Sequence, residues 1–384
     1  MKLLNIIIKS LKEQARSFWV FILTVSMGPF FVFVYYLIYE SSKPHYDVLI
    51  VNNDTGIMHN SINYGALFID SFNKSLKDSV AIPFTLNTAK DRDSALSELK
   101  SKKTDAVIIL PADFSENLGN YSMGDSSKTA EIEFIGDLTN INYLVSAVWA
   151  GEFLNSYGYT VTGVKKNFQV HETPVGVSGS INDFDLIVPG LLILSVIMLM
   201  FPATIAIISE VENRTIMRLK MSGISALEYL TGVSLVQVLI GIIAVFLTLL
   251  TAILLGFKNI GPVWILILFS IVTGISIIEF SLIIAAATKT ANEVLIVGNF
   301  PMLLFMFFTG SAYPIHSNGL FTIMGYPVSI QGLMSPTHAI SALNKVMILE
   351  MGIKDVIPEL IAILLLSVIY FMIGIFLFQK RHLN

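Results

Sequence analysis

The sequence predicts an α-helical polytopic membrane protein with six transmembrane helices and a mixed α/β extracytoplasmic domain inserted between the first two helices. Three observations lead to this prediction: six long apolar stretches, one polar region between the first two of them, and an uneven distribution of lysine and arginine. Of the 384 residues, 54% are hydrophobic and only 14% are charged, and the mean hydropathy is +0.72. Because soluble chains are about 25% charged, the composition excludes a soluble enzyme and a disordered linker protein.

Six stretches are long enough to cross a membrane, since a helix needs about 20 mostly apolar residues to cross roughly 30 Å of hydrocarbon. The first stretch has no charged residue and no small-residue cleavage site after it, so we interpret it as a retained anchor and not as a signal peptide. The fifth is interrupted by Gly298, Asn299 and Pro301. The six stretches are Phe18–Tyr39, Leu186–Ser209, Leu230–Gly256, Val263–Thr288, Val294–Tyr313 and Val356–Phe378.

Lysine and arginine predict the orientation, because cytoplasmic connections of membrane proteins carry an excess of both. In a six-span topology, ten of these residues near span ends fall on one side and three on the other. We therefore expect both termini to be cytoplasmic and residues 40–185 to be extracytoplasmic. The ten are Lys2, Lys9, Lys12, Arg16, Arg214, Arg218, Lys220, Lys289, Lys380 and Arg381, and the three are Lys258, Lys345 and Lys354.

Residues 1–16, ahead of the first transmembrane helix at 17–39, predict a cytoplasmic amphipathic interfacial helix. Apolar residues recur at helical spacing, and charged residues occupy the remaining arc. Such a helix can lie in the membrane interface and contact lipid, and a simple cytoplasmic extension of the first transmembrane helix is the alternative. The apolar positions are Leu3, Leu4, Ile7, Ile8 and Leu11, and the charged ones are Lys9, Lys12, Glu13 and Arg16.

Residues 40–185 are too polar for the membrane and too regularly patterned for a linker. Residues 41–185 hold 18 acidic and 11 basic side chains, so the acidic excess of the chain is concentrated there. Short apolar runs alternate with helical stretches, which predicts a small mixed α/β domain. The expected strands are Val48–Val51, Ala81–Leu86, Ala106–Leu110 and Glu131–Ile135, and the expected helices are Asn60–Asp78, Arg92–Lys100, Ala112–Leu118 and Asn140–Ser156.

The sequence contains none of the common motifs of an enzyme. It has no G-x-x-x-x-G-K-[ST] phosphate loop, no H-E-x-x-H zinc motif and no G-x-S-x-G nucleophile motif. It has no cysteine, and His45, His59 and His171 are not at metal-ligand spacing. No basic patch of the nucleic-acid-binding kind occurs either. We therefore expect no catalytic residue, no metal site and no nucleic-acid partner.

Residues 210–223 form a short charged connection between the second and third spans of the five-helix transmembrane domain at 186–384. Glu210, Arg214 and Arg218 follow one another at i,i+4 spacing, with the acid N-terminal to the bases, which favours a helix. The segment also carries apolar residues that a solvated loop would not need. These features suit docking to a cytosolic partner. The alternative is an interfacial helix that holds lipid headgroups through its three cations, Arg214, Arg218 and Lys220.

Several residues inside the spans are candidates for lining a pathway. An acidic group in a membrane is costly and tends to face a cavity or a partner, so Glu279 is either a pathway carboxylate or a hydrogen-bonded structural group. Gln237 and Asn299 are pathway candidates, with interhelical hydrogen bonds as the alternative. Phe300 could line an apolar conduit or simply pack against its neighbours. We also expect part of residues 311–344 to re-enter the outer leaflet.

Four fragments in a fixed order resemble one family of membrane proteins. They are Val188-Pro-Gly-Leu191 at the start of the second span, the Glu210–Leu219 segment, the Leu96–Leu99 and Ala106–Ser115 stretch, and Leu333-Met-Ser-Pro-Thr-His338. The family pattern after the second span is Glu-x-Glu-x-Gly-Thr followed by Leu, and here Arg214 replaces the Gly. The chain therefore resembles the permease subunit of a type-2 ABC exporter, in the subgroup with a large extracytoplasmic loop after the first span.

The resemblance implies a division of labour. Two permeases, either two copies of this chain or this chain and a sibling, would form the translocation pathway in a bacterial plasma membrane. Separate cytosolic ABC ATPase subunits would bind and hydrolyse ATP, so this chain would need no cofactor of its own. A periplasmic adaptor is a further partner where such a protein exists. The resemblance implies that seven residues couple the permease to the ATPase: Glu210, Glu212, Arg214, Thr215, Arg218, Leu219 and Lys220.

Two other functions compete with this one. An ion-coupled transporter would use Glu279 as its titrating group. A non-transporting scaffold would present residues 40–185 to a partner in the cell envelope.

Overall fold

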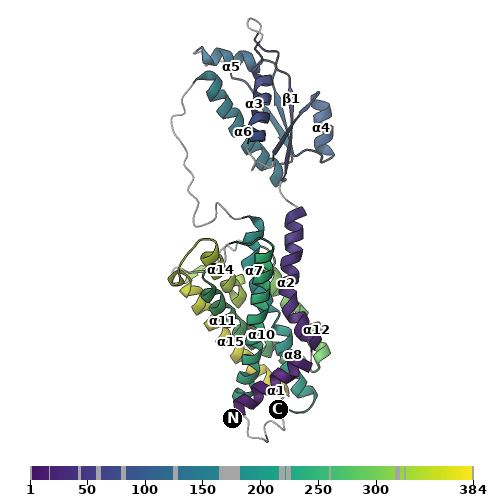
Figure 1. Ribbon diagram of the computed structural model, residues 1–384, viewed down its shortest axis with the longest axis vertical. Helices are drawn as coiled ribbons and strands as arrows, with labels where there is room; N and C mark the ends of the chain where they lie inside the picture. Colours follow the sequence, from purple (N-terminus) through teal and green to yellow (C-terminus); the bar gives the residue numbers. More distant parts are fainter. Residues whose placement is uncertain are drawn as a thin grey trace. The chain divides into compact units, whose positions relative to one another are not determined.

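The computed structural model contains two compact units, one formed by Met1–Ser41 together with Thr173–Asn384, and the other by Ser42–Glu172 (Figure 1). The second unit ends at Glu172. The next described helix begins at Asp183, behind a capping box formed by Asn182 and Asp185. The structure describes residues 2–16, 18–41, 45–57, 62–78, 84–123, 129–163, 182–215, 221, 226–258, 261–315, 321–323 and 326–382.

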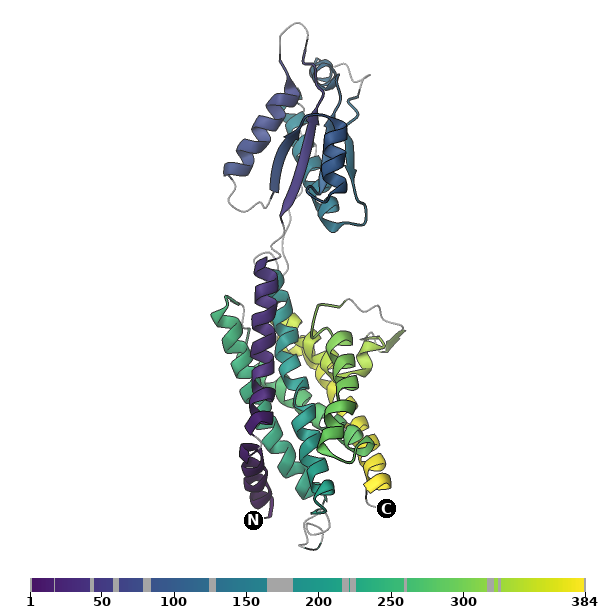
Figure 2. The same cartoon turned by 90° about the vertical axis from the view of Figure 1, so that its right-hand side faces the viewer.

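The first unit is helical, and both chain termini lie at one end of it, which we call the terminal end (Figures 1 and 2). Among the described residues, six helical stretches are long and apolar enough to cross a membrane, in agreement with the six predicted spans. These spans are built from α2 (Phe18–Ser41), α7 (Asp183–Ile197) with α8 (Met200–Glu212), α10 (Ala226–Leu254), α11 (Val263–Ala287), α12 (Ala291–Val297) with α13 (Asn299–Phe308), and α15 (Ile357–His382).

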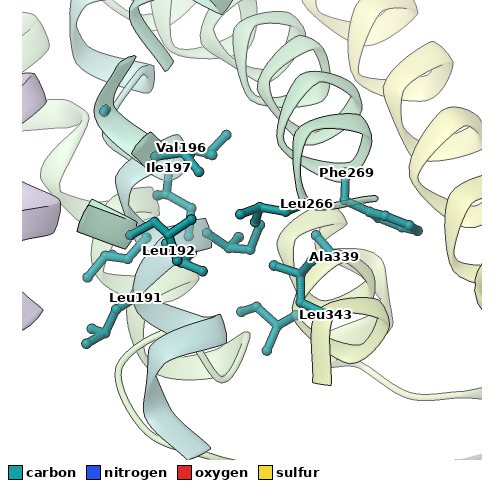
Figure 3. Packing of buried hydrophobic residues seen from close by; sticks show 14 of the residues in the cluster. Leu191, Leu192, Val196, Ile197, Leu266, Phe269, Ala339 and Leu343 are labelled. Carbon is teal, nitrogen blue, oxygen red and sulfur yellow. The ribbon is translucent and has the colours of Figure 1, made fainter. Parts of the chain in front are cut away.

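The second span is the centre of this unit. Of its most apolar stretch, 83% is buried inside the chain, whereas the corresponding value is 17% for the fifth span. Side chains of α7 pack against α11 and against a short helix, α14 (Ser335–Met347) (Figure 3). Gly190 of the Val-Pro-Gly-Leu motif lets the backbone at Gly310 approach α7 closely, since a Cβ at Gly190 would lie only 2.7 Å from the carbonyl oxygen of Gly310. The packed side chains include Leu191, Leu192, Val196, Ile197, Leu266, Phe269, Ala339 and Leu343.

The segment between the fifth and sixth spans folds back into this core. Helix α14 has 13 residues, which gives a length of about 20 Å and is too short to cross the membrane. Much of it is nevertheless buried among the other helices of the unit. In the chain it follows a hairpin of β5 (Phe321–Ile323) and β6 (Tyr326–Val328) and a short 3₁₀ turn at Gln331–Leu333, and a second 3₁₀ turn at Ile353–Val356 comes after it.

The fifth span is divided at Gly298, which separates α12 from α13. Pro301 falls in the first turn of α13, where its missing N–H removes no intrahelical hydrogen bond. The span ends at Phe308 and not at the predicted Tyr313, because Gly310 adopts a φ of +88° that starts a turn.

The second unit contains a four-stranded mixed sheet in the order β2-β1-β3-β4. The first three strands are parallel, and β4 pairs antiparallel with β3. Alternate residues of β1 and β3 face two separate cores, one shared with α3, α5 and α6 and the other with α4. The strands are β1 (Tyr46–Asn52), β2 (Phe84–Ala89), β3 (Ala106–Leu110) and β4 (Glu133–Gly136), and the helices are α3 (Tyr64–Asp78), α4 (Arg92–Lys100), α5 (Phe114–Ser122) and α6 (Ile141–Thr162).

The elements of this unit follow the predicted order, but several boundaries differ. Helix α6 continues to Thr162 and not only to Ser156, because Tyr157 packs on the core and its hydroxyl donates to the carbonyl oxygen of Tyr64 at 3.0 Å. Strand β2 extends past the predicted end at Leu86 to Ala89, in register with β1.

The carboxylate of Asp54 joins the loop after β1 to the first turns of two helices. It accepts hydrogen bonds from the backbone N–H of Gly65 at 2.9 Å and of Ser115 at 3.1 Å, and from the Ser115 hydroxyl at 2.5 Å. Burial alone would raise the pKa of Asp54, but the hydrogen bonds from Ser115, Gly65 and Gly56 outweigh burial and hold this pKa below its usual value of 3.8. The ionised form therefore stabilises the fold above the unfolded pKa, and this contribution is lost as the pH falls through the folded pKa.

We predict that Asp54→Asn lowers the stability of the sheet unit by about 2 kcal/mol, because an amide nitrogen cannot accept the hydrogen bonds that the carboxylate accepts. Hydrogen–deuterium exchange of the full chain should show faster exchange at the amides of Gly65 and Ser115. The matched control is Asp137→Asn, an exposed carboxylate that bonds only to Thr139 in the described residues and should have little effect on those amides. Unchanged protection in Asp54→Asn would contradict this role.

Candidate functional site

The charged connection after the second span begins with a helix end and not with a continuing helix. Helix α8 ends at Glu212, and Arg214 has a φ of +55°, in the left-handed region that favours glycine. The N–H of Thr215 donates to the Glu210 carbonyl at 2.9 Å and that of Arg214 to the Val211 carbonyl at 3.0 Å. This pair of bonds is a Schellman motif. The predicted i,i+4 pairing of Glu210 with Arg214 is therefore wrong, since the two side chains are not one helical turn apart.

Glu210 is instead enclosed by partners from elsewhere in the chain. Its side chain carboxylate accepts hydrogen bonds from the Lys9 ammonium group and from the Thr215 hydroxyl, and the residue is only 4% exposed. Lys9 also lies 3.5 Å from Glu13, one turn further along the same helix. An ionised carboxylate shielded from water is costly unless it is paired and hydrogen-bonded, and Lys9 and Thr215 meet this requirement.

Lys9 belongs to α1 (Lys2–Arg16), which packs on α10 at the terminal end (Figure 2). Ile6 and Ser10 of α1 are buried, and Gly232 of α10 lets the helices approach, since a Cβ at Gly232 would lie 2.5 Å from Ile6 Cγ2. Burial of Lys9 acts to lower its pKa, but the hydrogen bond and charge of Glu210 and the charge of Glu13 together raise the pKa above 10.5. Lys9 is therefore charged at neutral pH, and its contribution to stability is lost only as the pH rises through that raised pKa.

Glu212 points to a different helix. Its carboxylate accepts a hydrogen bond at 3.0 Å from the N–H of Ala291, the first residue of α12. A negative charge at a helix N-terminus is favourable because the first N–H groups of a helix have no intrahelical partner. The end of α8 is thus bonded to α1 through Glu210 and to α12 through Glu212 (Figure 1).

The family model described as "ABC-2 family transporter protein" matches residues 16–376. The chain belongs to the ABC-2 family. It is accordingly an ABC transporter permease and a multi-pass membrane protein. No curated protein matches the chain.

In this ABC-2 permease, four of the seven predicted coupling residues lie together at the terminal end. Glu210 is buried, Thr215 is half-buried, and Glu212 and Arg214 are exposed. Arg218, Leu219 and Lys220 lie outside the described residues.

The predicted pathway residues do not form one cluster. Glu279 of α11 accepts a hydrogen bond from Ser367 of α15, which favours the structural interpretation of this carboxylate. Gln237 of α10 is fully buried, and neither of its amide atoms has a hydrogen-bond partner among the described residues of this chain. The amide of Asn299 donates to the Leu295 carbonyl within the same span.

Two ion pairs of this permease were not predicted from the sequence. Lys9 and Glu210 are 201 positions apart, and although both were noted separately, no local pattern connects them. Lys345 of α14 lies 2.6 Å from Glu359 of α15, whose side chain is almost completely buried. Among the described residues, no group of three His, Asp or Glu side chains could hold a metal ion.

We predict that Arg214→Gly raises the stability of the permease by about 0.5 to 1 kcal/mol, because glycine adopts the left-handed conformation without a Cβ clash. Arg214→Val should lower it, since a β-branched residue is poorly accommodated there. Thermal unfolding in detergent would measure both changes. The control is Asn213→Gly, where φ is −81° and glycine should give no gain. Equal effects of glycine at both positions would contradict the left-handed conformation at Arg214.

Proposed function

We propose that this chain is the membrane-spanning subunit of an ATP-driven exporter. It would form the translocation pathway with a second permease and receive movement from separate cytosolic ATPase subunits. The observation that supports coupling to the ATPase most directly is how the C-terminal end of α8 is bonded to its neighbours. Bonds to α1 and α12 hold this end on two sides, while Glu212 and Arg214 remain exposed. A surface that is exposed but firmly anchored can transmit force from a bound partner to the helices behind it.

Other features support the same division of labour. The sequence has no phosphate-binding loop of its own, so ATP would be bound by the partner subunits. Met221, within the coupling segment 210–223, is 80% exposed, and exposed methionines suit adaptable protein contacts. The lysine and arginine distribution supports a cytoplasmic terminal end and an extracytoplasmic sheet unit. The family resemblance supports a bacterial plasma membrane as the location.

The fifth span supports a pathway formed between two permeases. Phe300 is 70% exposed on the outside of this chain, and Ile296, Leu303 and Phe307 are exposed on the same helical stripe. Asn299 beside them is also exposed. A polar amide facing lipid is unfavourable, and a second permease packed on this stripe would remove it from lipid. The predicted pathway residues Asn299 and Phe300 would then line the boundary between the two permeases.

We predict that an ABC ATPase subunit co-purifies with the chain, and that the double reversal Arg214→Glu with Arg218→Glu weakens this association about tenfold or more. The reason is that the partner surface would be complementary to the original positive charges, and the reversed charges would be repelled by it. Quantitative co-purification from the native host would measure the change. The control is Lys354→Glu, an exposed lysine on the opposite predicted side. Export activity without any ATPase subunit would contradict the proposal.

We predict that a cysteine at Phe300 cross-links two copies of the chain, because residues near a two-fold axis meet their own symmetry mates. The natural sequence has no cysteine, so single-cysteine variants give an unambiguous result. A short bismaleimide applied to membranes should produce a dimer band with Phe300→Cys. It should not do so with Met372→Cys, which is 64% exposed on α15. Cross-linking of Met372→Cys but not of Phe300→Cys would contradict the proposal that two permeases meet at the fifth span.

A further inference from the structure

We propose that the sheet unit binds an uncharged small molecule with a flat apolar body, in a cavity between α5 and α6. The cavity has a volume of about 340 Å³. Sites for small molecules usually have volumes of about 300 to 1,000 Å³ and combine an apolar lining with a few polar groups. The inference goes beyond the proposed function, because it concerns recognition in the sheet unit and not the coupling of membrane helices to an ATPase.

The inner wall of the cavity is built from core side chains. Phe114 of α5 and Leu154 of α6 line it, are only 4% and 8% exposed, and belong to the core that α5 and α6 share with the sheet. Leu118 and Ile132 also line it and pack against the same core. Because the fold already holds these side chains, a ligand would not have to order them, and this lowers the cost of binding.

Two of the lining residues are tyrosines that stay largely exposed. Tyr121 of α5 is 45% exposed, and Tyr159 of α6 is 41% exposed. A tyrosine ring offers an apolar face on which a flat ligand can stack, while its hydroxyl keeps a polar tip. Tyrosine also supplies a large contact area at a low cost in conformational entropy. One tyrosine on each helix therefore favours a ligand with a flat apolar body.

The polar groups of the lining are amides and hydroxyls. Asn117 is only 5% exposed, and its two amide N–H groups donate to Asp113 Oδ2 at 2.7 Å and to the Thr129 carbonyl at 3.4 Å. Its side-chain oxygen receives no hydrogen bond from the described residues and remains an acceptor. Asn155 and Thr129 also line the cavity and are exposed. A neutral polar group on the ligand can thus be matched by hydrogen bonds.

The lining differs in charge from the region around it. Residues 41–185 hold 18 acidic and 11 basic side chains, yet no charged residue is among the described residues that line the cavity. An ionised group that leaves water without an ion-pair partner is strongly unfavourable, whereas a neutral group that gains a hydrogen bond is tolerated. The cavity therefore selects uncharged molecules.

Gly158 leaves part of the cavity unfilled. It lies in the middle of the arc of α6 that lines the cavity, since Leu154 and Thr162 are each four residues away on the same face. A Cβ at Gly158 would meet no atom within 4 Å. A larger side chain at this position can therefore occupy the volume that the ligand would take, without displacing other side chains first.

The test uses the full chain in lipid nanodiscs and the photoreactive probe 4-benzoylbenzamide, which has two aromatic rings and a neutral amide. We expect saturable labelling of peptides from α5 and α6, located by mass spectrometry. The matched probe 4-benzoylbenzoate has the same rings and a negative charge, and it should label these peptides at least about tenfold less. Labelling by the amide that does not saturate, or equal labelling by both probes, would overturn the inference.

A pair of glycine substitutions supplies the second measurement. Gly158→Leu should reduce the saturable labelling about tenfold or more, because the leucine side chain fills the site. The matched control is Gly151→Leu on the same helix, where a Cβ also meets no atom within 4 Å but the residue does not line the cavity. Leucine is more favourable than glycine inside a helix, so both variants should fold. Full labelling of Gly158→Leu, or an equal loss in Gly151→Leu, would refute the proposed site.

The result is independent of the proposed function, because the experiment contains no ATPase and measures no transport. Absence of saturable labelling would remove the binding site and leave the exporter proposal unchanged. Absence of an ATPase partner would remove the exporter proposal, and the binding site would still be judged by its labelling.

Discussion

A carboxylate that folding shields from water must find a cation or a hydrogen-bond donor in the protein. Much of the polar architecture of this permease follows from that constraint. Glu279 receives the Ser367 hydroxyl, Glu359 receives Lys345, and Glu210 receives Lys9 and Thr215. In each case the partner comes from another helix or from beyond the helix end. These bonds therefore fix which helices are neighbours, whereas apolar contacts alone would tolerate sliding.

The Glu-x-Glu-x-Gly-Thr pattern gains a physical explanation from the end of α8. The first acid pairs with the N-terminal helix, and the second caps the first turn of α12. The Gly position is the left-handed residue that ends the helix, and the Thr that follows returns a hydroxyl to the first acid. Arg214 keeps the turn although it lacks the conformational freedom of glycine. The turn is therefore set by the bonds around it and not by the residue at its centre.

Hydropathy and span length predicted the six spans and their order, because both quantities depend only on local sequence. The mixed sheet also followed from alternating strands and helices. The end of α8 could not be predicted in this way, because Glu-Val-Glu-Asn-Arg-Thr has no glycine or proline to stop a helix. The partner of Glu210 was equally inaccessible, since Lys9 becomes its neighbour only when α1 packs on α10. Gln237 was expected to bond across helices because buried amides usually do, and nothing local shows which side of α10 faces an apolar core.

The complete enclosure of α7 separates folding from transport within one chain. Every residue from Val188 to Ile197 is buried against neighbouring helices of the same subunit, so none of them can touch a passing molecule in this conformation. In an exporter of the kind proposed, cargo would instead meet helices at the periphery, such as α13. Variation along α7 would then alter how much protein reaches the membrane. Selection for a new cargo could proceed at the periphery without disturbing the centre of the subunit.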